Sequence, residues 1–242
     1  MGLTASGKSW LGIQLAKLFN GEIISCDSRQ IYKTLDIGSA KVTHAEQQEA
    51  VHHMLDIINP GEKYDVYQFQ QDASKIINEI HSRKKLPILV GGTGLYSRAI
   101  VENYDFVNNK MGERKYDVLQ IALMPPKTWL FETIAKRNQQ RYEQGMMMET
   151  GQLLKNGVCP NWLKKIGLDY QLTTKHILGE LDWDEFVYWH HTKTMQYAKR
   201  QRTWFNREQN TIFLTDQKLY ENPDLLLKEA QRLVQQWKQL TQ

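Results

Sequence analysis

The chain begins with a complete phosphate-binding loop, the octapeptide GLTASGKS at residues 2–9. It matches the spacing G-x-x-x-x-G-K-[ST] at every fixed position. The glycines allow the backbone to curl around an anion, Lys8 supplies a positive charge, and Ser9 offers a hydroxyl group to Mg²⁺. Leucines at 11, 15 and 18 predict the helix that must follow such a loop, so we expect a phosphorylated small-molecule substrate rather than a glycine-rich helix cap. The residues expected to contact this substrate are Gly2, Thr4, Ala5, Ser6, Gly7, Lys8 and Ser9.

Short apolar runs alternate with helical patterns through the first hundred residues, which is typical of a parallel sheet covered by helices. Strands are predicted at 22–26, 86–90, 118–123 and 211–214, and helices over about 66–80 and 223–240. The sequence therefore predicts an α/β fold of the P-loop NTPase type, with a helical C-terminal half. The strand that normally anchors a phosphate-binding loop is missing, since only Met1 precedes Gly2. Either the start is truncated or another strand fills that place.

Composition narrows the class of protein. With 242 residues, 41% of them hydrophobic and 24% charged, the chain can bury a sizeable core in one α/β domain. It has no run of eighteen apolar residues and no basic N-terminal segment followed by an apolar stretch, which argues against a membrane span or a secretion signal and favours a cytoplasmic location. Cys26 and Cys159 lack metal-ligand spacing, which argues against a disulfide framework or a structural zinc site.

Polar residues follow two of the predicted strands, at the sheet edge where ligands bind in folds of this kind. Asp27 comes directly after the first strand and is a candidate base or Mg²⁺ ligand; the alternative is a helix N-cap. The sequence GGTGLY at 91–96 follows the next strand, where glycines permit close approach and Thr93 offers a hydroxyl. The alternative for this segment is a tight strand-to-helix turn.

Taken together, these segments resemble the tRNA dimethylallyltransferase (isopentenyl-tRNA transferase) family. The resemblance rests on the phosphate-binding loop, then CDSRQIYKTLDIGSAKVT, HHMLDI and ILVGGTGLY in that order. It resumes with TIAKRNQQRYEQGMMMETGQLLKNG, which looks like the family's helix with an arginine and then a glycine at fixed spacing, and with TMQYAKRQRTWF. By that match Arg137 is the arginine concerned.

The resemblance implies a reaction and roles for five residues. Family members prenylate the exocyclic amine of an adenosine beside the anticodon, and their loop binds the pyrophosphate of dimethylallyl diphosphate rather than ATP. Carried over, Lys8 binds the pyrophosphate, Ser9 binds Mg²⁺, and Asp27 takes a proton from the amine. Thr93 lines the channel, and Arg137 stabilises the charge that grows on the leaving group. The implied partners are dimethylallyl diphosphate and the anticodon stem-loop of tRNA, with no membrane, and a monomer is expected.

A basic, aromatic segment supports an RNA partner. Residues 186–207 contain no acidic side chain, and lysines and arginines alternate there with tyrosines and tryptophans, which suits phosphate contacts and base stacking. The alternative is a helix with core aromatics and a solvated charged face. His190 and His191 are expected to be surface or core histidines, and Met146–Met148 to be packing residues. The predicted tRNA contacts are Asp27, Ser28, Arg29, Gln30, Lys164, Lys165, Gly167, Lys199 and Arg200.

Several departures from the family pattern mark a shortened member. The helical insertion that normally grips the anticodon stem is almost absent, so residues 107–116 form a short junction between a first part, 1–106, and the remaining core with its helical segment, 117–242. The usual motif G-Y-[KR]-E is replaced by GLDY at 167–170, with Lys164 and Lys165 as candidate substitutes for the basic residue, and Met195 stands where arginine is usual. Three alternatives therefore remain: transfer to a free adenine nucleotide, an ATP-dependent small-molecule kinase, and an impaired relative.

Overall fold

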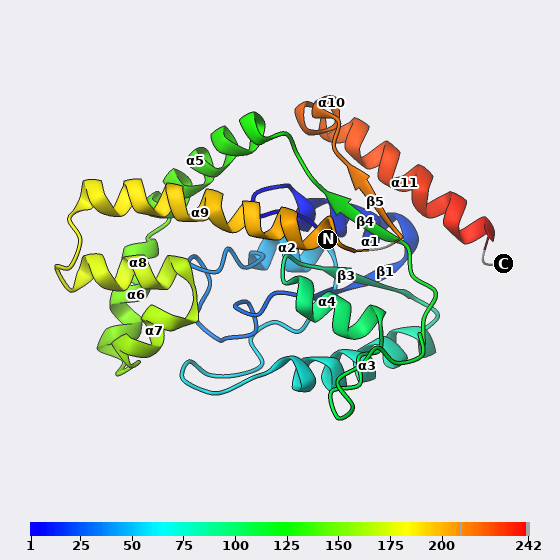
Figure 1. Ribbon diagram of the computed structural model, residues 1–242, viewed down its shortest axis with the longest axis horizontal. Helices are drawn as coiled ribbons and strands as arrows, with labels where there is room; N and C mark the ends of the chain where they lie inside the picture. The colour runs from blue at the N-terminus through cyan, green and yellow to red at the C-terminus, as the bar shows by residue number, and fades with distance from the viewer. Residues whose placement is uncertain (209, 241–242) are drawn as a thin grey trace.

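The computed structural model describes residues 1–208 and 210–240 (Figure 1). A phosphate loop leads into the first helix, and short parallel strands then alternate with helices, as the apolar runs predict. The strands are β1 (Gly21–Ser25), β2 (His52–His53), β3 (Leu86–Val90), β4 (Gln120–Leu123) and β5 (Thr211–Leu214). The helices are α1 (Lys8–Phe19), α2 (His44–Glu49), α3 (Val66–Ser82), α4 (Gly94–Val101), α5 (Lys127–Glu143), α6 (Met146–Lys155), α7 (Pro160–Ile166), α8 (Leu168–Ile177), α9 (Trp183–Phe205), α10 (Gln217–Glu221) and α11 (Pro223–Leu240).

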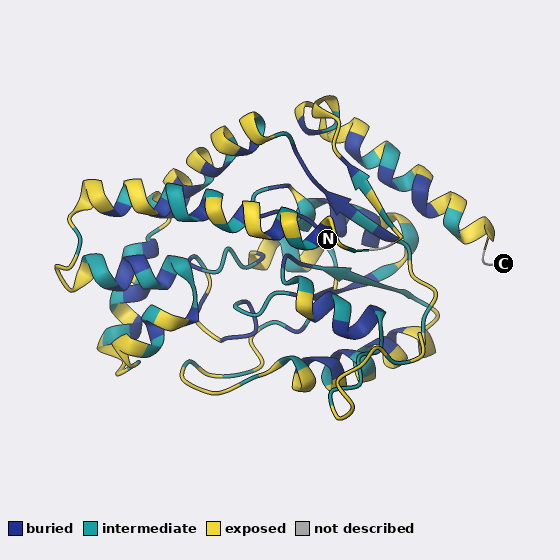
Figure 2. Ribbon diagram, in the orientation of Figure 1, coloured by how far each residue is buried: buried dark blue, intermediate teal, exposed yellow. Residues whose placement is uncertain are grey.

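The strands are parallel and have helices on both faces, which confirms the predicted fold class. β1 is buried along almost its whole length, as an apolar strand covered on both faces must be (Figure 2). On one face, apolar residues of α3 and α4 pack on β1, and Phe69 of α3 stacks on Tyr96 of α4. On the other face, α1 packs with α11 over β4 and β5. α3 starts at a capping box in which Asp65 and Gln68 satisfy each other's backbone N–H groups.

The sheet is divided into two pieces. One has the order β2-β1-β3 and the other pairs β4 with β5, and all of these pairs are parallel. Between β3 and β4 lies an apolar slot of about 600 Å³, lined by both strands and by Met1. No strand among the described residues fills it. The first residues pair with β4 beside it, where Leu3 N donates to Leu123 O and Leu123 N donates to Met1 O, at 3.2 and 3.0 Å.

This slot explains most of the difference between predicted and observed strands. Val118 and Leu119 belong to the predicted strand but precede β4, because they line the slot instead of pairing with a neighbour. Cys26 lies just beyond β1, although its N–H still donates to Val90 O at 2.8 Å. The two-residue β2 was not predicted, since His52 and His53 lack the apolar β-branched pattern. The strands 86–90 and 211–214 and the helix 223–240 are confirmed.

A helical region extends from the sheet and is built from α5 to α9 (Figure 1). α9 is its longest helix and runs from this region to the sheet, where it packs beside α4. α5 connects β4 to the helical region and packs against α9. No helix in the described part of the chain has the length and apolar character needed to cross a bilayer.

Candidate active site

The phosphate-binding loop adopts the geometry that its glycines predict. Gly7 is in the left-handed region at φ 84° and forms the N-cap of α1, and Ala5 also has a positive φ of 61°. Ser6 N donates to Leu3 O at 3.2 Å, which closes the turn. No side chain in the described residues caps the start of α1, so its first N–H groups remain available to an anion.

A glutamine from α9 holds this loop to the neighbouring strand end. Gln201 accepts a hydrogen bond from Thr4 N at 2.8 Å and donates one to Gly92 O at 2.9 Å. Its side chain is buried, and a Cβ on Gly92 would lie 2.4 Å from Gln201 Nε2. Gln201 therefore fixes the two glycine-containing turns relative to each other. Gln201 lies in one of the segments that carry the family resemblance, but its role could not be predicted, because the contact joins positions almost two hundred residues apart.

Two cations converge on the loop. Arg137 of α5 donates from Nη2 to Thr4 Oγ1 at 2.7 Å, and Lys8 Nζ lies 3.5 Å from Leu3 O. Burial lowers the pKa of Lys8 to about 8, although Asp27 attracts its charge; Arg137 lowers it further. Burial likewise lowers the pKa of Arg137 to about 10. Two desolvated cations beside one helix N-terminus form a strong anion site.

Buried polar atoms without partners mark the same place. Within the described residues, Ser6 Oγ and Arg137 Nε are buried and have no hydrogen-bond partner. Such orphaned groups are costly unless a ligand satisfies them. A cavity of about 680 Å³ opens in front of the loop, and its walls include residues 5–9, Arg137 and the segment from Ala40 to Thr43.

Asp27 stands beside the loop, as predicted from its place after β1. Its Oδ1 accepts a hydrogen bond from Arg29 N at 2.9 Å, which forms a turn rather than a helix cap. Asp27 lines one small cavity together with Lys8 and Ser9. Carboxylate and hydroxyl oxygens are ligands that suit Mg²⁺, which also keeps waters and substrate phosphates. This donor set therefore fits the metal that the phosphate loop implies.

Thr93 holds the strand end near Asp27. Its Oγ1 accepts a hydrogen bond from Ser28 N at 3.3 Å, and its own N–H donates to Cys26 O at 3.3 Å. It is the N-cap residue of α4 but makes no side-chain cap bond. The structure thus brings Thr93 to the turn that carries Asp27.

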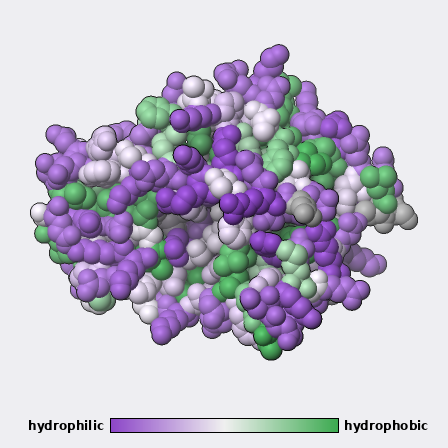
Figure 3. Space-filling view, viewed as in Figure 1, coloured by the Kyte–Doolittle hydropathy of each residue, from purple (hydrophilic) through white to green (hydrophobic). Residues whose placement is uncertain are grey.

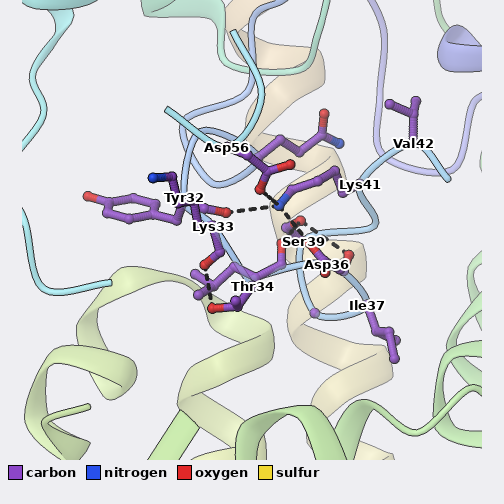
Figure 4. Close-up of polar contacts among 12 residues, drawn as sticks. Tyr32, Lys33, Thr34, Asp36, Ile37, Ser39, Lys41, Val42 and Asp56 are labelled. Atoms are coloured by element: carbon purple, nitrogen blue, oxygen red, sulfur yellow. Dashed lines mark hydrogen bonds and ion pairs between the residues drawn. The ribbon is translucent and has the colours of Figure 1, made fainter. Parts of the chain in front are cut away.

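The segment from Tyr32 to Val42 forms the wall opposite the loop and is braced by one buried lysine. Lys41 Nζ bonds to Tyr32 O at 2.8 Å and pairs with Asp36 and Asp56 at 2.6 and 2.5 Å (Figure 4). Its side chain is only 3% exposed. Although Lys41 lines the cavity, its charge is already compensated, so it serves the wall rather than a ligand.

The predicted tRNA contacts divide into exposed and internal groups. Gln30 is buried and ties the wall together, because it accepts from Ser25 Oγ and donates to Ala40 O, both at 3.0 Å. Lys164 pairs with Glu180. Arg29 lies against Gly167, where a Cβ would come within 3.2 Å of its Nε. Lys165, Lys199 and Arg200 are exposed.

The two histidines have different surroundings. His190 is fully buried, and its Nε2 lies 2.9 Å from Asp169 Oδ1 while its Nδ1 lies 2.6 Å from Tyr142 Oη. His191 packs edge-on against Phe131. The sequence assigned His190 to the core or surface without a partner; its partners come from other helices. Met146 is fully buried, as expected for packing, but Met148 is exposed.

This chain is similar to known proteins along most of its length. A family model described as IPP transferase matches residues 30–113 and 105–208. A tRNA dimethylallyltransferase 2 of Shewanella sediminis is 37% identical, with 86% of this chain and 87% of that protein covered. The crystal structure of a tRNA Δ(2)-isopentenylpyrophosphate transferase from Staphylococcus epidermidis superposes with a TM-score of 0.87 at 28% identity, covering 98% and 97% of the two chains. A eukaryotic dimethylallyltransferase acting on tRNA gives 0.75 at 25% identity, over 88% and 72%.

The family model matches in two segments that overlap at residues 105–113. The junction at residues 107–116 stays a prediction. The alignment with the Shewanella protein runs over 264 positions although it uses 86% of the 242 residues, so a sizeable stretch of that protein has no counterpart here. The family model matches most of the chain, and the Shewanella protein is 37% identical with 86% of this chain covered. This chain therefore belongs to the IPP transferase family.

Proposed function

We propose that this chain transfers a dimethylallyl group from dimethylallyl diphosphate to the exocyclic N6 amine of an adenosine beside the anticodon of tRNA. The observation that carries the proposal is the convergence of Lys8, Arg137 and Asp27 on the phosphate-binding loop of a member of this family. The first two residues suit the diphosphate, and the third suits the amine. Family resemblance supplies the acceptor, since the curated relative is named for tRNA.

The leaving group is the best-supported part of the mechanism. As the bond between the allylic carbon and the diphosphate oxygen breaks, negative charge grows on the diphosphate. The N–H groups at the start of α1, the Lys8 ammonium and the Arg137 guanidinium stabilise that charge. Mg²⁺ held by Ser9 would supply additional charge neutralisation. A diphosphate oxygen would also give a partner to the buried Arg137 Nε.

Asp27 accepts the proton that the adenine amine loses. The N6 nitrogen forms its new bond to the allylic carbon, and one of its protons passes to the Asp27 carboxylate. Asp27 is only partly buried and lines the small cavity that Lys8 and Ser9 also line, so we expect an adenine approaching the diphosphate to reach it. Because an adenine amine is a weak nucleophile, holding it in line contributes more than any single charge. A loop nucleotide can leave its stack at modest cost.

The RNA would lie along α9. Hydrophilic residues dominate the surface along this helix (Figure 3). Lys199 and Arg200 are exposed for phosphate contacts. Closer to the start of the same helix, Tyr188 and Trp189 are 63% and 40% exposed. Lysine and arginine contacts give salt-dependent binding, and exposed aromatics provide surfaces on which unpaired bases stack.

One assay tests the proposal. The purified chain is incubated with Mg²⁺, labelled dimethylallyl diphosphate and bulk tRNA, and the nucleosides of the digested tRNA are examined by mass spectrometry. We expect a prenylated adenosine and salt-sensitive binding of an anticodon stem-loop. Prenylation of free adenine nucleotide but not of tRNA would show that the nucleotide is the acceptor. Phosphoryl transfer from ATP would indicate a kinase. Tight diphosphate binding with no product on any acceptor would indicate an impaired relative.

A further inference from the structure

A second arginine lies one helical turn beyond Arg137 and faces inward. Arg141 is 4% exposed. Its guanidinium group carries five N–H donors and binds three acceptor groups. Its Nε donates to Ile37 O at 2.9 Å, its Nη2 to Gly38 O, and its Nη1 to Asp169 Oδ1 at 2.8 Å. These bonds attach α5 to the cavity wall and to the start of α8.

The carboxylate partner of Arg141 is itself held in place. Asp169 also accepts from His190 Nε2 at 2.9 Å, and His190 Nδ1 lies 2.6 Å from the hydroxyl of Tyr142. Burial alone would raise the pKa of Asp169, but the attraction of Arg141 and the hydrogen bond from His190 outweigh it, so its pKa lies well below the usual range. Burial lowers the pKa of His190, which favours the neutral ring, and a neutral ring protonated at Nε2 would donate to Asp169 and accept from Tyr142.

The wall is fixed a second time from α6. Glu149 accepts hydrogen bonds from the backbone N–H groups of residues 36, 37 and 38 at 2.7 to 2.9 Å, and from Tyr170 Oη at 2.7 Å. Arg141 takes two carbonyl groups of the same turn, at Ile37 and Gly38. A turn that is bound through both its donors and its acceptors is a rigid support for α5.

From this geometry we propose that Arg141 is a positioning residue: by clamping α5 to the turn at residues 36–38, it sets the place of Arg137 over the phosphate-binding loop. Positions 137 and 141 are separated by one helical turn, so they lie on one face of α5. Arg137 reaches Thr4 while Arg141 reaches the wall. The resemblance assigns a role to Arg137 and none to Arg141, and Asp169 stands where the family motif has a basic residue.

The test is a double-mutant cycle on the binding of inorganic pyrophosphate with Mg²⁺, measured by calorimetry. Arg137→Gln removes a charged hydrogen-bond donor from the anion and is expected to weaken binding about 10- to 100-fold. Arg141→Gln should weaken it roughly fivefold or more through misplacement of Arg137. The double variant should bind no more weakly than Arg137→Gln alone, because Arg141 acts only through Arg137. Multiplication of the two effects would overturn the proposal.

Controls separate positioning from loss of folding. Arg141→Lys keeps a charge near Asp169 but cannot reach three partners, so it should show the same coupling at a smaller cost. Arg232→Gln, at an exposed position on α11, matches the chemical change and should leave pyrophosphate binding unchanged. Circular dichroism and thermal unfolding confirm that each variant is folded.

Because the placement of Arg137 matters to catalysis only under the proposed function, the two ideas are tested apart. Tight pyrophosphate binding with coupled arginines but no prenyl transfer would reject the prenyltransferase and keep the positioning role. Prenyl transfer together with independent effects of the two arginine substitutions would keep the prenyltransferase and reject the positioning role. Failure of the unaltered chain to bind pyrophosphate would overturn both.

Discussion

Two loops of this molecule offer backbone N–H groups that can bind negatively charged oxygen, and they differ in whether a side chain of the chain itself supplies that oxygen. The turn at residues 36–38 directs three N–H groups at Glu149, a side chain of the same molecule. At the phosphate-binding loop, no described side chain caps α1, and Lys8 and Arg137 supply cations instead. The first loop is a structural joint, and the second is the loop at which we propose that a ligand binds.

The difference shows that backbone geometry alone does not make a binding site. A carboxylate brought from a distant helix converts an anion-binding turn into a support, whereas buried cations and an unsatisfied Arg137 Nε leave the other loop dependent on a ligand. The two loops are also connected, since α5 touches the turn through Arg141 and the phosphate loop through Arg137. Substitutions in the two loops should therefore separate ligand binding from stability.

The largest expected effect concerns the ligand-binding loop. Asp27→Asn keeps the size of the side chain but removes the base, and we expect prenyl transfer to fall about 10²- to 10⁴-fold. Pyrophosphate binding should remain close to that of the unaltered chain, because the cations that hold it are unchanged. Single-turnover assays and calorimetry measure the two quantities. Turnover close to that of the unaltered chain would remove the base assignment.

At the structural turn, the largest effect is expected from removal of Glu149. Glu149→Ala leaves three backbone N–H groups without their acceptor, and we expect the free energy of unfolding to fall by about 2–4 kcal/mol. Urea unfolding measures the loss. Acetate in the buffer should restore part of the stability if the turn behaves as an anion site. Glu46→Ala, which removes the exposed capping box of α2, is the matched control and should not respond to acetate.

Substitutions at two glycines should have smaller and opposite effects: one should mainly affect stability and the other mainly ligand binding. At Gly38 a Cβ would lie 2.3 Å from the ring of Tyr170, so Gly38→Ala should destabilise the fold by about 1–3 kcal/mol. At Gly7 a Cβ would meet nothing within 4 Å, and only its φ of 84° is strained, which costs about 1 kcal/mol. Gly7→Ala should nevertheless weaken pyrophosphate binding more than Gly38→Ala. Thermal unfolding measures the stability of both variants, and calorimetry measures their pyrophosphate binding. Equal effects on binding would contradict this prediction.

The same contrast explains what the sequence could predict. The phosphate loop, Asp27 after β1 and Thr93 after β3 are local patterns, and their chemistry follows from a few adjacent residues. Gln201, Arg141, Glu149 and His190 act through partners far along the chain, which periodicity cannot reveal. Gln30 stays a predicted tRNA contact, and only the structure shows that its side chain is buried among its own neighbours. The division of the sheet into two pieces could not be predicted, because the apolar runs indicate each strand but not which strands pair.

The smallest effect is a pH dependence that belongs to the ligand-binding loop alone. Burial lowers the pKa of Lys8 to about 8, and the protonated form is the one that attracts an anion. Pyrophosphate affinity should thus be level below pH 8 and fall as pH rises above it, by up to about tenfold per unit for the share of binding that depends on this charge. Lys8→Arg keeps the charge throughout this range, and calorimetry at pH 7, 8 and 9 should show a flatter profile for it. An equally steep decline in that variant would place the titrating group elsewhere in the site.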